Sequence, residues 1–347
     1  ISAAKNKKED SRYEGKNVNK VDKNTFFIED GMYTTCESDT PHTHFTASEM
    51  KVIQKDKIIA KSTVFQYLSQ KLTLIMDKQI EIGIHQWVEN LQSQGKYAFS
   101  LTMLQNQLPG LSDIAVKSAL SRLSKKGLII SIHKGYYLII TPQYKSKGIL
   151  PPTLFLDAFM NELNRPYYLA LLNAAAYHGA SHQQQQEFFV VTSFPVLRPT
   201  QKKGLKINYI SKKELPENLL DAKKTETGYL KISNPVLTAT DLIQYQKRVG
   251  GINRVASVLN ELAEAIKPDA FDNYLLQHIP ITALQRLGYL LDKVFDNQPL
   301  ANALYTSLQN SNASFFRTAL KASAATKGFT ADEKWKVIIN TTIELDE

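Results

Sequence analysis

Residues 100–140 constrain the fold of this chain more than any other stretch. Their pattern predicts a short helix over Leu101–Gln107, followed by a turn at Pro109-Gly110. A second helix is expected to begin at Ser112, because a serine hydroxyl can accept a hydrogen bond from a free N–H of the first turn. The same helix should end at Gly127, since glycine tolerates the left-handed position that follows a helix.

The residues after these two helices predict the rest of the motif. Two β-rich runs flank His133-Lys134-Gly135, which indicates a hairpin. Helix, turn, helix and hairpin in this order are typical of a winged helix-turn-helix, which places one helix in a DNA major groove and the hairpin beside it. Such shapes also serve as protein-interaction modules, and this alternative stays open at the level of the sequence.

The second helix separates into two sides when it is projected at ~3.6 residues per turn. Val116, Ala119, Leu120 and Leu123 should face the core. The other side should offer cations to phosphates, and hydroxyls and Ile114 to base edges, although a lysine-rich side is often only solvated. The expected DNA contacts on helix and hairpin are Ser112, Ile114, Lys117, Ser118, Ser121, Arg122, Lys125, Lys126, His133 and Lys134.

Composition limits the classes of function. The chain has 347 residues, enough for two or three domains, and its net charge of +9 favours polyanionic partners. Cys36 is the only cysteine, so an internal disulfide and a cysteine-based zinc site are excluded. No apolar run approaches the ~20 residues of a membrane span. We find no Gly-rich phosphate loop, G-x-S-x-G or H-E-x-x-H motif, and therefore expect neither an enzyme nor a cofactor.

The first 62 residues differ in character from the rest. Short alternating runs predict a β-meander or jelly roll; they are Thr25–Glu29, Met32–Thr35, His44–Ala47, Met50–Gln54 and Ile58–Lys61, with turns at Gly31 and Lys55-Asp56. Through Asp30-Gly31, Tyr33-Thr34-Thr35-Cys36 and Phe45-Thr46-Ala47, this stretch resembles the OstA-like repeat of lipopolysaccharide-assembly proteins. The resemblance implies a β-scaffold of the cell envelope.

The pattern changes again at Met76. Beyond it, apolar residues at helical spacing predict the first helix of the winged-helix domain; they are Ile80, Ile84, Trp87, Val88 and Leu91. One hypothesis is that Met76 begins a self-contained protein, and the alternative is a two-domain protein with a β-rich extension. The expected division is 1–62 β-rich extension, 63–75 linker, 76–141 winged helix-turn-helix and 142–347 C-terminal domain.

The C-terminal part is expected to be mixed and then largely helical. A helix should follow Pro151-Pro152, and another should run from Tyr167 to His178, with Pro166 at its start and Gly179 at its end. Strands are expected over Glu187–Thr192 and Leu205–Ile210, helices over most of Leu237–Glu347, and a returning strand within Trp335–Asn340. The predicted fold class of the whole chain is therefore α+β.

Several motifs of this part resemble one family. They are Pro166-Tyr167-Tyr168, Ala174-Ala175-Ala176, His178-Gly179-Ala180, His182-Gln183-Gln184, and Asp241–Ile266 with Tyr245 and Gly250-Gly251. From Met76 onward the chain is similar to the AbiEi antitoxins of type IV toxin–antitoxin systems, which act in abortive phage infection. The resemblance implies a cytoplasmic antitoxin and transcriptional autorepressor. Its winged helix would bind inverted repeats of operator DNA as a monomer or dimer, and its C-terminal part would counteract a nucleotidyltransferase-type toxin without a stable complex.

The resemblance implies an antitoxin surface, which we expect at Tyr167, Tyr168, His178, His182, Arg198, Lys202 and Lys203. Core packing is the alternative for the two tyrosines. The histidines could bind a metal with Glu187, but Gly179 should break the helix between them, so we expect a hydrogen-bonded structural role and no metal. The basic loop from Arg198 to Lys203, with Lys206 and Lys212-Lys213 beyond it, could contact DNA beside the operator, contact toxin-associated RNA, or only be solvated.

Two other classes of function remain open in the sequence. The OstA-like stretch favours a scaffold or binding protein of the cell envelope. An enzyme related to nucleases or nucleotidyltransferases would use His178, His182 and Glu187.

Overall fold

The computed structural model describes residues 4–8, 11–22, 25–34, 43–53, 57–67, 83–180 and 187–345. The chain divides into two compact units, one comprising Ile1–Asn90 and Leu108–Leu123, the other Leu91–Gln107 and Ser124–Glu347. Helices and strands occur together in an α+β fold, as predicted. The domain boundaries expected from the motifs divide the chain differently and stay a prediction.

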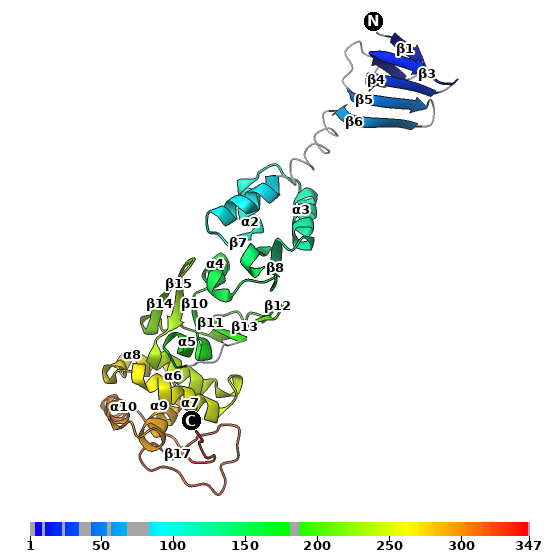
Figure 1. The fold of residues 1–347 in the computed structure, drawn as a ribbon. Coiled ribbons are helices and arrows are strands. Elements are labelled where there is room, and N and C mark those ends of the chain that lie inside the picture. The colour runs from blue at the N-terminus through cyan, green and yellow to red at the C-terminus, as the bar shows by residue number, and fades with distance from the viewer. Residues whose placement is uncertain are drawn as a thin grey trace. The chain divides into compact units, whose positions relative to one another are not determined.

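The N-terminal strands form one antiparallel sheet, drawn in blue in Figure 1. Its order is β1-β2-β4-β5-β6, and β3 also pairs with β4. The strands are β1 (Ala4–Lys8), β2 (Ser11–Gly15), β3 (Asn17–Lys20), β4 (Thr25–Thr34), β5 (Thr43–Ile53) and β6 (Lys57–Tyr67). Ile28 and Met50 lie in its small core.

The strands of this sheet are longer than predicted. The runs Thr25–Glu29 and Met32–Thr35 were expected as two strands, but β4 continues through Gly31. Glu29 pairs with Glu49 and Gly31 with Ala47, so the register is the same on both sides of Asp30, although Asp30 itself has a positive φ of 43°. The predicted turn at Gly31 is thus wrong. In the same way β5 joins the runs His44–Ala47 and Met50–Gln54, while Thr35, Gln54 and Lys55-Asp56 lie outside the described residues.

The helix-turn-helix and hairpin elements are confirmed. Residues 83–93 are helical, and α2 (Leu101–Gln107) and α3 (Asp113–Lys125) follow. The N–H of Ala115 donates to Ser112 Oγ at 3.2 Å, the predicted cap, and Gly127 has the expected positive φ of 71°. The hairpin consists of β8 (Ile129–His133) and β9 (Tyr136–Ile139); β7 (Ala98–Ser100) pairs with β9 in a three-stranded sheet. Ile80 lies outside the described residues.

A six-stranded mixed sheet organises the second unit (Figure 1). Its order is β12-β13-β11-β10-β15-β14. The strands are β10 (Tyr167–Leu169), β11 (Glu187–Ser193), β12 (Thr200–Lys202), β13 (Leu205–Lys212), β14 (Leu220–Thr225) and β15 (Gly228–Ser233). The strands predicted over Glu187–Thr192 and Leu205–Ile210 are confirmed, whereas part of the expected basic loop is strand β12.

The helix predicted over Tyr167–His178 is wrong in its first part. Residues Tyr167–Leu169 form β10, which pairs antiparallel with β11 and parallel with β15. Helix α5 occupies only Leu171–Tyr177, and Leu171 makes the change of direction with a positive φ of 56°. Strand β10 lies inside the sheet, and its three residues are all buried. Its sequence therefore lacks the alternation of apolar and polar residues by which a half-exposed strand is predicted.

Helices α4 (Leu156–Glu162) and α6 (Pro235–Gln244) contact strand β15 of the sheet. Further helices follow along the chain; they are α7 (Ile252–Leu262), α8 (Asn273–His278), α9 (Ile281–Tyr289) and α10 (Gln298–Asn310), with a π-helical turn over Leu290–Val294 after α9. The largely helical C-terminal part is thus confirmed, and the predicted returning strand is the short β17 (Val337–Ile338), which pairs with β16 (Thr318–Ala319). None of the described helices has the length and apolar composition that crossing a membrane would require.

Two hydrophobic cores lie in the second unit, and β10 contributes to both. Tyr168 belongs to the core that contains α6, α7, α9 and α10. Tyr167 belongs to the other core, together with Phe159 of α4 and with Tyr136 and Leu138 of the hairpin. The hairpin therefore packs into the same core as the large sheet.

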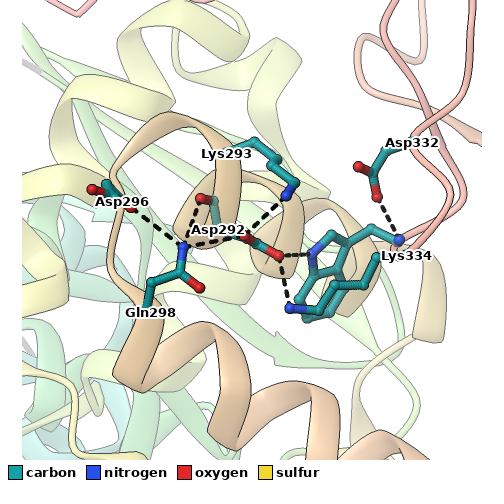
Figure 2. A network of polar contacts seen from close by, with 7 residues as sticks. Asp292, Lys293, Asp296, Gln298, Asp332 and Lys334 are labelled. Atoms are coloured by element: carbon teal, nitrogen blue, oxygen red, sulfur yellow. Dashed lines mark hydrogen bonds and ion pairs between the residues drawn. The ribbon is translucent and has the colours of Figure 1, made fainter.

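The C-terminal segment is fixed to the π-helical turn by Asp292, which Figure 2 shows between Gln298 and Lys334. Asp292 Oδ2 accepts from Lys334 Nζ at 2.8 Å and from Trp335 Nε1 at 2.9 Å. Burial alone would raise the pKa of Asp292, but hydrogen bonds from Lys334, Trp335 and Gln298 outweigh it and hold that pKa well below its ordinary value. The network connects residues about forty positions apart in the chain.

Candidate functional site

Helix α3 buries one side and exposes the other, as predicted. Ala115, Val116, Ala119, Leu120 and Leu123 are buried. Ile114 is 79% exposed, a large value for an isoleucine, and it lies in the first turn of the helix, directly after the capped N-terminus. The other predicted DNA contacts of this helix are exposed too; they are Ser112, Lys117, Ser118, Ser121, Arg122, Lys125 and Lys126. Hydroxyls and cations thus share one solvent-facing side with an apolar side chain.

The hairpin places its two candidate residues differently. His133 is exposed, but its ring lies 5.6 Å from the ring of buried Phe159, and its carbonyl oxygen accepts from Ser131 Oγ at 2.9 Å. Lys134 precedes Gly135, whose φ is 74°, in the turn between β8 and β9 and is exposed. Lys134 is therefore the hairpin side chain best placed to reach a phosphate, while His133 also braces the hairpin.

The second basic cluster separates into two groups. Arg198, Lys202 and Lys203 are exposed, and β12, which contains Lys202, lies against β8 of the hairpin. Lys206 instead pairs with Glu187 at 2.8 Å, and Lys212 points into the interior. Only the first group remains a candidate contact surface.

The histidine site predicted as an alternative is not assembled. His178 Nε2 lies 2.7 Å from the carbonyl oxygen of Ser233, a structural contact, and His182 lies outside the described residues. Glu187 is held by Lys206 and by Asn208, each at 2.8 Å, which lowers its pKa. The described residues contain no cluster of three His, Cys, Asp or Glu side chains that could share a metal ion.

The core-packing alternative for the two tyrosines is confirmed, and neither can contribute to an antitoxin surface. Tyr167 is 2% exposed and Tyr168 is fully buried, because both lie in the central strand β10. Tyr167 donates its hydroxyl proton to Asp157 Oδ1 at 2.9 Å on one face of the sheet. Tyr168 reaches the other face, where it contacts residues far away in the sequence.

A closed polar cluster lies on that second face. Lys212 Nζ, at the end of β13, donates to Asp241 Oδ1 of α6 at 2.7 Å and to Tyr168 Oη at 2.9 Å. The hydroxyl of Tyr168 donates to Asp241 Oδ2 at 2.8 Å. The ammonium group also lies 5.7 Å from the ring of Tyr168 and 5.8 Å from that of Tyr245, the residue after α6.

The cluster is almost completely removed from water. The side chain of Lys212 is 15% exposed and that of Asp241 is fully buried. Burial, together with the charge of Asp241, raises the pKa of Tyr168 well above its ordinary value and that of Tyr245 to about 12. Both tyrosines are therefore neutral near pH 7, and the cluster ties the sheet to α6 through charge-assisted hydrogen bonds.

Sequence reasoning singled out Tyr168, Asp241 and Tyr245 as family motifs but placed Lys212 on a basic surface. The residue that joins them was therefore missed. Lys212 could have been identified by its position soon after the apolar strand Leu205–Ile210. A lysine there must either point to solvent or pair with a buried acidic side chain. The sequence does not show which acid is near.

The crystal structure of the RV2827C protein from Mycobacterium tuberculosis is similar in fold, with a TM-score of 0.53, 16% identity, and coverage of 72% of this chain and 89% of that one. A search of curated proteins finds no match. The model of the AbiEi antitoxin C-terminal domain matches residues 168–293, which contain the whole cluster. Residues 168–293 are thus similar to the C-terminal domain of the AbiEi antitoxins.

Proposed function

We propose that this chain is an antitoxin and also the transcriptional repressor of its own operon, and the match of residues 168–293 to the AbiEi antitoxin C-terminal domain supports the first role. Helix α3 binds operator DNA in the major groove, and the β8–β9 hairpin contacts the adjacent backbone. The C-terminal domain counteracts a nucleotidyltransferase-type toxin. The chain acts in the cytoplasm, in defence against phage, without itself being an enzyme.

The observation that supports DNA binding most strongly is the exposed side of α3. Ile114, Lys117, Ser118, Ser121 and Lys125 follow one another at helical spacing and are all exposed. An isoleucine that only stabilised the fold would be buried. At the N-terminal end of a recognition helix it can contact a thymine methyl group, while lysines farther along contact phosphates.

The exposed cations near β12 lie beside the hairpin. Lys202 lies on a strand next to β8, and Arg198 precedes that strand. These side chains would contact the DNA backbone next to the site of the hairpin. Of the two partners considered for this cluster, DNA beside the operator is thus favoured over RNA.

The test is binding of the purified chain to DNA from upstream of its own gene, measured by fluorescence anisotropy at several salt concentrations. Lys117→Gln and Lys125→Gln should each weaken binding and lower the slope of log K against log salt by about 0.9, because one phosphate contact is lost. Ile114→Ala should reduce the preference for operator over unrelated DNA and leave the slope unchanged.

Lys327→Gln is the matched control, since Lys327 is exposed on a loop far along the chain from α3. It removes the same charge and should change the slope little. Equal slopes for the Lys117 and Lys327 variants would contradict the assignment of α3 as the recognition helix.

A further inference from the structure

A groove in the second unit is lined by residues that, apart from Lys203, have no part in the function proposed above. Its volume is about 650 Å³, within the range of about 300–1,000 Å³ typical of small-molecule sites. It is lined by residues 144–153 after the hairpin, the end of α5, and the start of β13 with the turn before it.

The groove is cationic. Lys147 and Lys203 line it, and none of its described lining residues is acidic. The nearby carboxylate of Glu187 is already bound by Lys206 and Asn208. The lining therefore favours an anionic ligand.

The backbone holds Lys203 in place. Lys203 and Gly204 both have positive φ, 48° and 81°, in the tight turn between β12 and β13. Positive φ at both positions is the usual geometry of a two-residue hairpin turn, and it fixes where the lysine stem leaves the backbone. The stem of Lys203 lies beside Gly148, since its Cε would be only 4.0 Å from a Cβ at that residue.

The remaining walls suit a planar group. Three aromatic side chains, Tyr144, Tyr177 and Phe188, line the groove, and Tyr177 is 36% exposed. The amide of Asn173 is fixed by bonds from Phe189 N at 2.9 Å and to the carbonyl oxygen of Glu187 at 3.1 Å. An amide NH₂ has two hydrogens, so a second one remains for a ligand.

We propose that this groove binds a nucleoside phosphate. The base lies against the aromatic side chains and hydrogen-bonds the amide of Asn173, and the phosphates bind Lys147 and Lys203. Aromatic faces that stack a base beside cations that hold phosphates are the combination by which proteins bind nucleotides without a helical groove. The nucleotide is either free or the end of an RNA strand.

The test is isothermal titration calorimetry of the full chain with ATP, GTP, tripolyphosphate and adenosine. At least one nucleotide should bind more tightly than tripolyphosphate or adenosine. Lys203→Gln should weaken nucleotide binding about tenfold, the effect of one charge-assisted hydrogen bond. Tyr177→Ala should weaken binding of the nucleotide but not of tripolyphosphate, and Lys327→Gln should change neither.

A thermal melt of each variant confirms that it folds, and its DNA affinity is measured in parallel. Because Tyr177 has no part in the proposed DNA interface, the Tyr177→Ala variant should keep its DNA affinity, so the two proposals can fail independently. If an oligoribonucleotide binds more tightly than the mononucleotide, the ligand of the groove is the end of an RNA strand. If the mononucleotide binds more tightly, the ligand is a free nucleotide. Absence of saturable binding, or equal binding of tripolyphosphate and nucleotide, overturns the proposal.

Discussion

At the scale of single residues, two buried aspartates connect distant parts of the second unit. Asp241 joins α6 to the end of β13 through Lys212, and Asp292 joins the π-helical turn to Lys334 and Trp335. Both carboxylates have more than one hydrogen-bond partner. A buried carboxylate is tolerated only when it is paired in this way, so loss of one partner costs more than the pair contributes.

The first prediction concerns the Lys212–Asp241 pair. Lys212→Met should lower the free energy of unfolding by about 3–5 kcal/mol, because it leaves Asp241 buried without its cation. The double variant Lys212→Met/Asp241→Leu should recover part of that loss, since no uncompensated charge remains. Chemical denaturation of the four proteins of the double-mutant cycle checks this; additive effects of the two substitutions would show that the pair is not coupled.

The second prediction concerns pH. Because the folded pKa of Asp292 is depressed, its contribution to stability is complete above the ordinary pKa of about 4 and is lost as pH falls toward the folded value. Asp292→Asn should lower the free energy of unfolding by about 2–4 kcal/mol near neutral pH. This difference from the wild-type protein should become smaller below about pH 4.

The fluorescence of Trp335 can report this unfolding, in a Trp87→Phe background that leaves it as the only tryptophan. A pH-independent difference between the two proteins would contradict the role given to the carboxylate.

At the scale of elements, the helix-turn-helix and hairpin were predictable because their signals are local. A capping serine, a glycine at the helix end and a Lys-Gly turn each act on neighbouring residues only. Strand β10 was not predictable, since three residues buried on both faces have no periodicity of their own. Its identity depends on β11 and β15, which pair with it only in the folded chain.

The same limit applies to the candidate sites. The exposed side of α3 follows from helical periodicity and was predicted residue by residue. The Lys212 cluster and the groove each join segments that are far apart in sequence. Neither the spacing of residues nor the composition of a single sequence predicts such long-range contacts.

The third prediction concerns the contact between α9 and the C-terminal segment. A Cβ added at Gly288 would lie 2.0 Å from Cζ3 of Trp335, so Gly288→Ala forces the fully buried indole to move. We expect the free energy of unfolding to fall by about 1–3 kcal/mol. The fluorescence of Trp335 during chemical denaturation measures it. Gly83→Ala is the control, because nothing lies within 4 Å of its added Cβ. A Gly288 variant as stable as the control would mean that this packing is loose.

At the scale of the whole chain, repression and neutralisation should be separable by substitution. The full-length Lys117→Gln/Lys125→Gln variant should lose repression, because its phosphate contacts are gone, yet still protect cells that express the toxin. A reporter fused to the promoter measures the first activity, and growth during toxin expression measures the second. Loss of both activities by a variant that remains folded would mean that neutralisation requires DNA binding.

Removal of the N-terminal residues is a poorer experiment than substitution. A cut between residues 141 and 142 follows the boundary suggested by the motifs, but Tyr136, Leu138 and Ile140 share one core with Tyr167, Val190 and Ile207. Such a cut would expose an apolar face of the large sheet. The failure of a truncated protein would therefore report misfolding and not the absence of DNA contacts.

This shared core also bears on how such proteins diversify. Recombination between relatives at residue 141 would exchange the proposed DNA-binding part of the chain. It would also combine two halves of one hydrophobic core that had not been selected to pack together. Viable crossovers should instead lie before β7 or after β15, so that hairpin and sheet are inherited together.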